Sequence, residues 1–154
     1  MTGRGTEEDE RRSVTDPTID RETRQDVTDI LVRYATGIDR RDCPLFRSCF
    51  TDDCDVDYGD IGVWHGADAI TTYMDQTHAA CGYSLHRITN QAMTPNGDGV
   101  AASSYVDAII MDGENRRGVH AVGFYDDELV ETAAGWKISR RRFTMVLATS
   151  VGGR

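Results

Sequence analysis

The sequence predicts an α+β domain in which helices cover one face of a curved antiparallel sheet. Two observations favour this class. Residues 19–80 carry mostly the 3.6-residue period of helices, with one short alternating segment between them. Residues 83–147 instead read as four long strands joined by turns rich in Gly and Asn. Helices followed by such a meander leave room for a pocket between helix and concave sheet.

The 154-residue chain fits a single domain. Residues 1–18 are charged and almost without large apolar side chains, so we predict a disordered tail there. The domain is expected over residues 19–148, with a C-terminal tail over residues 149–154.

The first helix is predicted over residues 19–41, with an apolar stripe that includes Ile30, Tyr34 and Ile38. Asp39 follows at the edge of this stripe, where its carboxylate can lean towards the interior. Burial of a carboxylate costs free energy unless a partner compensates. The alternative is a surface aspartate that bonds Arg40 or nearby backbone.

A second helix is predicted to begin at Asp42-Cys43-Pro44, and a third over residues 66–80. Between them, residues 51–59 alternate as a half-buried strand that places Tyr58 inward. Asp53, Asp55 and Asp57 of this strand superficially resemble a calcium loop. Because Tyr58 stands where glycine is needed and Trp64 where a bidentate Glu is needed, no metal site is predicted.

The later strands are predicted over residues 83–94, 100–111, 117–131 and 136–147. Alternation in the first of them places His86 on the same face as Ile88, hence inward. An inward His on the sheet and Asp39 on the helix can satisfy each other, which fixes the tautomer and raises the basicity of the imidazole. The alternative is a buried histidine with a structural role.

Other polar side chains are weaker candidates. Tyr34 and Tyr58 are phenols on apolar stripes, so each could bind a substrate oxygen or simply pack in the core. Asp107 lies on a strand among Ala, Val and Ile, and is a third polar candidate or an outward one. His120 is weaker still. In residues 140–142, three consecutive arginines, alternation places the middle one opposite its neighbours.

The formal net charge of −9 argues against binding to nucleic acid or to an anionic membrane. The four cysteines form no CxxC pair and no zinc-finger spacing, so we expect free thiols in a cytoplasmic protein. Gly97-x-Gly99 precedes a strand instead of a helix, so it does not predict dinucleotide binding. The sequence thus predicts no cofactor.

Several segments together resemble the SnoaL-like branch of the nuclear transport factor 2-like superfamily, from about Asp20 to Leu147. They include Tyr34-Ala-Thr-Gly-Ile-Asp39-Arg-Arg-Asp42, Phe50-Thr-Asp-Asp53, Val56-Asp-Tyr58-Gly59, His86 with Asn90, Gly123-Phe-Tyr125-Asp126 and Gly135-Trp136-Lys-Ile138. Patterns of scytalone dehydratase, bile-acid 7α-dehydratase and hexachlorocyclohexane dehydrochlorinase are similar. This likeness implies a cone-shaped α+β barrel that forms a homodimer or homotrimer.

The resemblance also implies a function. Asp39 and His86 match the Asp and His of those enzymes, and Tyr34, Tyr58 and Asp107 match or lie near their pocket residues. We therefore expect a cofactor-independent lyase, of the dehydratase or dehydrohalogenase type, acting on a small apolar or polycyclic substrate. An isomerase, a polyketide cyclase, a non-catalytic ligand-binding module and an accessory subunit of a ring-hydroxylating oxygenase remain alternatives.

Overall fold

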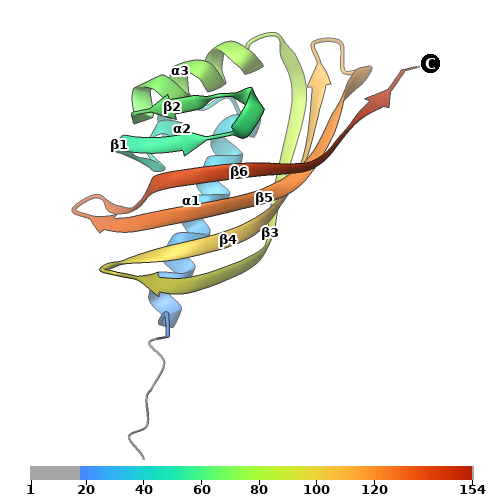
Figure 1. Ribbon diagram of the computed structural model, residues 1–154. Helices are drawn as coiled ribbons and strands as arrows, with labels where there is room; N and C mark the ends of the chain where they lie inside the picture. Colours follow the sequence, from blue (N-terminus) through green and yellow to red (C-terminus); the bar gives the residue numbers. More distant parts are fainter. Residues whose placement is uncertain (1–17, 154) are drawn as a thin grey trace, which may run out of the picture.

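The computed structural model describes residues 18–153 (Figure 1). The helices are α1 (Arg21–Asp39), α2 (Cys43–Arg47) and α3 (Ala67–His78), with a 3₁₀ turn at Gly59–Ile61. The strands are β1 (Phe50–Asp57), β2 (Val63–His65), β3 (Cys81–Asn96), β4 (Gly99–Asp112), β5 (Arg117–Thr132) and β6 (Gly135–Gly152). The α+β class is confirmed.

All six strands form one curved sheet in the order β2-β1-β6-β5-β4-β3, so the sheet stays open, with β2 and β3 at its edges. The pairs within β3–β6 are antiparallel, whereas β1 pairs with β6 in parallel. α1 lies across one face of the sheet, and α3 lies beside β1 and β2 at one end (Figure 1).

α1 begins where Asp20 caps it, because its side chain accepts the backbone N–H of Thr23 at 2.8 Å. Its apolar stripe is buried, with Tyr34 and Ile38 at most 3% exposed. Gly37 lets α2 approach closely, since a Cβ there would lie 2.8 Å from the backbone of Phe46. The end of α1, and with it Asp39, is thereby fixed against the rest of the core.

Some predicted boundaries need correction. β6 continues to Gly152, so residues 149–152 are strand and not a C-terminal tail, because they pair with the start of β5. The short strand β2 was not predicted. The disordered tail predicted over residues 1–18 falls almost entirely outside the described residues. Within the described part of the chain, no helix is long and apolar enough to cross a membrane.

Candidate active site

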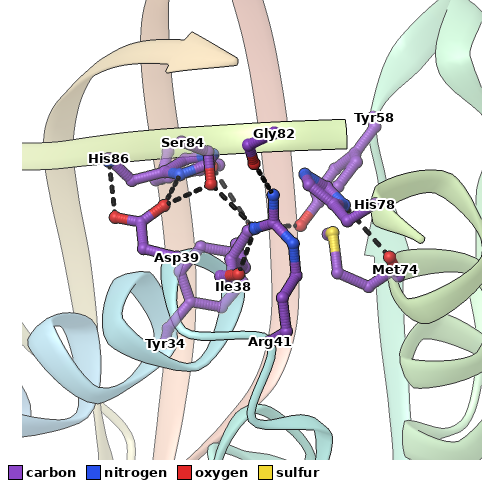
Figure 2. Close-up of polar contacts among 11 residues, drawn as sticks. Tyr34, Ile38, Asp39, Arg41, Tyr58, Met74, His78, Gly82, Ser84 and His86 are labelled. Carbon is purple, nitrogen blue, oxygen red and sulfur yellow. Dashed lines mark hydrogen bonds and ion pairs between the residues drawn. The ribbon is translucent and has the colours of Figure 1, made fainter. Parts of the chain in front are cut away.

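Asp39 and His86 meet at the junction of α1 and β3 (Figure 2). The Nδ1 of His86 lies 2.7 Å from Oδ1 of Asp39, and the backbone N–H of His86 donates to Oδ2 at 2.8 Å. The side chain of His86 is 7% exposed and that of Asp39 is 16% exposed. Two residues that are 47 positions apart thus form one largely buried pair, as the periodicities of helix and strand predicted.

The contact with Asp39 determines which nitrogen of His86 carries the hydrogen. A carboxylate oxygen only accepts, so Nδ1–H is the donor and Nε2 keeps its lone pair. Burial alone would raise the pKa of Asp39, but hydrogen bonds from His86 and Ser84, together with the charge of His86, lower it overall. Asp39 is therefore ionised at neutral pH, and the free nitrogen of His86 can act as a base.

His86 lines a cavity of about 470 Å³ between the sheet and α3. That size is typical of a site for a small organic molecule. Apolar side chains dominate the wall, and polar groups are few. Residues with polar groups in the lining include Tyr34, Tyr58, His78, His86, Asp112 and Tyr125.

Three buried phenols meet in the wall of this cavity. The hydroxyl of Tyr34 lies 2.6 Å from that of Tyr58 and 3.2 Å from that of Tyr125. Burial raises the pKa of Tyr58 and of Tyr125 well above the usual value, so both stay neutral. Two contacts consume two of the three hydroxyl hydrogens, and the third remains available for a ligand oxygen.

A buried ion pair supports these tyrosines. Arg141 donates two hydrogen bonds of 2.7 Å to Asp127, its neighbour across β5 and β6, and both side chains are fully buried. The guanidinium carbon lies 4.0 Å from the ring centre of Tyr34 and 3.9 Å from that of Tyr125. The predicted alternation of residues 140–142 is confirmed, with Arg141 inward. Since Asp127 neutralises its charge, Arg141 acts here as a support for the rings.

His78, at the end of α3, is a second imidazole in the cavity wall that the sequence did not single out. Its Nδ1 lies 3.0 Å from the carbonyl of Met74, which can only accept, so Nε2 carries a lone pair. Within residues 18–153 this nitrogen has no hydrogen-bond partner. Burial lowers the pKa of His78, and the nearby charge of Arg41 adds to this effect. His78 is therefore neutral at neutral pH.

Asp107 does not belong to the site, which corrects its assignment as a substrate-binding residue. Its neighbours Val106 and Ala108 line the cavity, so alternation along β4 turns Asp107 to the opposite face. There its carboxylate contacts His120 at 2.7 Å and Arg87 at 3.1 Å. These contacts satisfy the carboxylate of Asp107 without a ligand. His120 therefore lies outside the cavity as well.

All four cysteines are free, as predicted. Residues 18–153 contain no group of three or more His, Cys, Asp and Glu side chains placed to hold a metal ion.

Sequence reasoning missed Ser84, His78 and Tyr125 as parts of the site. A signal existed for each. Ser84 precedes His86 by two residues and so shares its strand face, while His78 follows the buried Ile70 and Met74 at helical spacing. Tyr125 was recognised only as part of a family-like segment.

Comparisons with known proteins agree with this fold. A sequence model of the SnoaL-like domain matches residues 20–142. The uncharacterized protein Rv2910c of Mycobacterium tuberculosis is 29% identical over 122 residues, which cover 77% of this chain and 82% of that protein.

Solved structures show the same fold. A candidate aromatic ring hydroxylase from Novosphingobium aromaticivorans is 26% identical, with a TM-score of 0.79 over 88% of this chain and 96% of that one. A type 2 hexachlorocyclohexane dehydrochlorinase is 19% identical, with a TM-score of 0.78 over 86% and 91% of the two chains.

Proposed function

Because the chain belongs to the SnoaL-like domain family, and the matched segment contains both Asp39 and His86, we propose that it removes a proton from carbon in a small, largely apolar molecule. The observation that carries this proposal is the largely buried pair, whose histidine lines an apolar cavity. The activity proposed is that of a lyase that needs no cofactor.

In the proposed reaction, Nε2 of His86 accepts the proton from a carbon made acidic by a neighbouring carbonyl or leaving group. The imidazolium that forms is stabilised by the ionised Asp39 at 2.7 Å. The electrons of the C–H bond form a double bond, and a hydroxyl or halide leaves from the adjacent carbon. General base catalysis of this kind contributes about 10²–10⁴ in rate.

The phenols supply the second part of the mechanism. A substrate carbonyl or leaving-group oxygen placed at Tyr34, Tyr58 and Tyr125 would accept the phenol hydrogen that the trio does not use internally. An apolar ligand that fills the cavity excludes water and strengthens both this hydrogen bond and the interaction of Asp39 with the imidazolium. Among the lining residues that the structure describes, Asp112 alone carries a charge, which disfavours an anionic substrate.

The same first step begins an isomerisation or an aldol-type cyclisation. These alternatives differ from a lyase after proton removal, because no leaving group departs. Exchange of an α-hydrogen of 2-tetralone in D₂O, without elimination from any halogenated or hydroxylated analogue, would favour an isomerase or a cyclase.

The base can be tested with 5-nitrobenzisoxazole, a small bicyclic compound that ring-opens when a base removes its one acidic C–H proton. We expect the wild type to accelerate this reaction, and His86→Gln and Asp39→Asn to lower the rate at least about 100-fold while retaining affinity for the unreactive analogue 5-nitroindole. His65→Gln is a matched control, because His65 contacts Asp55 at the same 2.7 Å but outside the cavity, with 75% of its side chain exposed.

Two results would contradict the proposal. One is a wild-type rate that does not exceed that of buffer. The other is a rate that His86→Gln leaves unchanged while the melting temperature falls, which would instead indicate a non-catalytic module that keeps the pair for structure.

A further inference from the structure

Arg41 reaches from the end of α1 to the beginning of β3 (Figure 2). Its Nη1 donates to the carbonyl of Ile38 at 2.7 Å and to Oγ of Ser84 at 2.9 Å, and its Nη2 donates to the carbonyl of Gly82 at 2.5 Å. Within the described residues, no carboxylate lies in salt-bridge contact with Arg41. The guanidinium is thus a cation held by neutral oxygen atoms beside the Asp39–His86 pair.

The backbone of Arg41 is also unusual. Its φ is +58°, in the left-handed region that residues other than glycine rarely adopt. Such a conformation is disfavoured for an L-residue, because Cβ lies too close to the following carbonyl oxygen. Glycine would fit this backbone better, and three hydrogen bonds of the arginine side chain hold Arg41 in this conformation.

Ser84 links this cation to the catalytic pair. A serine hydroxyl has one hydrogen, and since Arg41 donates to its oxygen, that hydrogen is free to donate to Oδ1 of Asp39 at 2.9 Å. Oδ1 also accepts the Nδ1–H of His86, and Oδ2 accepts the backbone N–H of the same residue. These two hydrogen bonds therefore run in one direction, from Arg41 through Ser84 to the carboxylate.

We propose that Arg41 is a positioning residue that sets the direction of the Ser84 hydroxyl and thereby fixes Asp39 as the acceptor for the Nδ1–H of His86. Without Arg41, the Ser84 hydroxyl could turn away from Asp39 and leave Oδ1 with a single donor. The lowered pKa of Asp39, to which the Ser84 bond contributes, agrees with this role. The inference rests on the proposed function, because it concerns the same base.

A simpler role would be that of a clamp that ties the end of α1 to β3. A clamp would affect folding stability but not the tautomer of His86 or the titration of Asp39. These two properties can be measured by ¹⁵N and ¹³C NMR in the absence of any substrate, so the inference can fail independently of the proposed reaction.

The test uses Arg41→Gly, which suits the left-handed backbone and removes the cation. Ser84→Ala removes the link, and Arg40→Gly on the exposed neighbour is the control. We expect Arg41→Gly and Ser84→Ala each to raise the titration midpoint of Asp39, to populate the Nε2–H tautomer of His86, and to lower the 5-nitrobenzisoxazole rate about tenfold. Arg40→Gly should match the wild type.

Chemical rescue separates charge from clamping. Guanidinium chloride at millimolar concentration should restore the tautomer and the rate of Arg41→Gly, but not those of Ser84→Ala, in which the hydroxyl is missing. An unchanged tautomer and an unchanged Asp39 titration in Arg41→Gly, with only a lower melting temperature, would overturn the inference. So would a failure of guanidinium to rescue.

The titrations must be assigned to residues, because other groups share this neighbourhood. His78 on α3 faces Arg41, and its own pKa depends partly on the charges of Arg41, His86 and Asp39. The remaining titratable groups in contact with the cavity include Tyr34, Tyr58, Tyr125 and Asp112. Repeating the experiment in a His78→Phe background removes the second imidazole signal and leaves the expected change at His86 intact.

Discussion

Replacing Asp127 by Asn should be among the most destabilising single changes in this domain. Asp127 and Arg141 are both fully buried and share two hydrogen bonds of 2.7 Å. Burial raises the pKa of Asp127, while the charge of Arg141 and its hydrogen bonds oppose that effect. An amide in place of the carboxylate leaves the guanidinium charge uncompensated.

The magnitude can be worked out from the cost of an unpaired buried charge. Breaking a buried ion pair by removing one partner costs about 3–5 kcal/mol. The amide oxygen can still accept one hydrogen bond, so we expect about 3 kcal/mol. For a domain of this size that corresponds to a fall of roughly 10 °C in melting temperature. It would also loosen Tyr34 and Tyr125, whose rings lie on Arg141.

Thermal unfolding followed by circular dichroism measures this effect. The double variant Asp127→Leu with Arg141→Met removes both charges and should recover at least half of the lost stability, because apolar side chains of similar volume often replace a buried pair at little cost. A fall of less than about 3 °C for Asp127→Asn would refute the reasoning. A double variant less stable than the single one would refute it too.

Three further predictions concern pH, thiols and assembly. Because burial lowers the pKa of His78 below its usual 6.5, the unfolded chain binds the proton more readily, and stability should fall as pH drops through about 6.5. His78→Phe should remove that part of a plot of melting temperature against pH, and an unchanged slope would contradict it. Burial raises the pKa of Cys49 and of Cys54 to about 11, so both thiols should resist iodoacetamide at about pH 8 until the protein is denatured. Mass spectrometry can follow the modification, and labelling of either thiol in the folded protein would contradict this prediction. We also expect light scattering to show a homodimer or homotrimer. Tyr105 lies on an exposed apolar part of the outer sheet face, so Tyr105→Asp should shift the assembly towards monomer. An unchanged mass for this variant would contradict an interface on that face.

Periodicity was sufficient to place the main elements and to assign Asp39 and His86 to inward faces. The helical stripe ended beside Asp39, and the two-residue period of β3 turned His86 inward, so each residue could be assigned to a face from local spacing alone. Pairing them needed one additional step, which was that a buried carboxylate requires a partner.

The rest of the site depends on facts that spacing does not contain. Alternation separates the two faces of β4 but does not say which of them meets the cavity, so Asp107 was misassigned. Only the register of β4 with β3 decides this. Ser84 shares the face of His86 by simple alternation, but its contact with Asp39 depends on how α1 packs against β3, which spacing does not predict. Arg41 reaches Ser84 through a left-handed backbone, which the presence of an arginine does not predict.

Residues 18–153 contain three His–Asp contacts of the same length, and the proposed base is the one that is largely buried. His86–Asp39, His65–Asp55 and His120–Asp107 all measure 2.7 Å. In the last two, the imidazoles are 75% and 36% exposed, so water screens the carboxylate and competes for the same hydrogens. The imidazole of His86 is 7% exposed and belongs to the wall of an apolar cavity, where the carboxylate acts through a lower dielectric and a ligand can displace water. The three pairs therefore differ in burial and not in distance. This difference is why the apolar stripe of α1 indicated Asp39, while the exposed aspartates of β1 indicated no site.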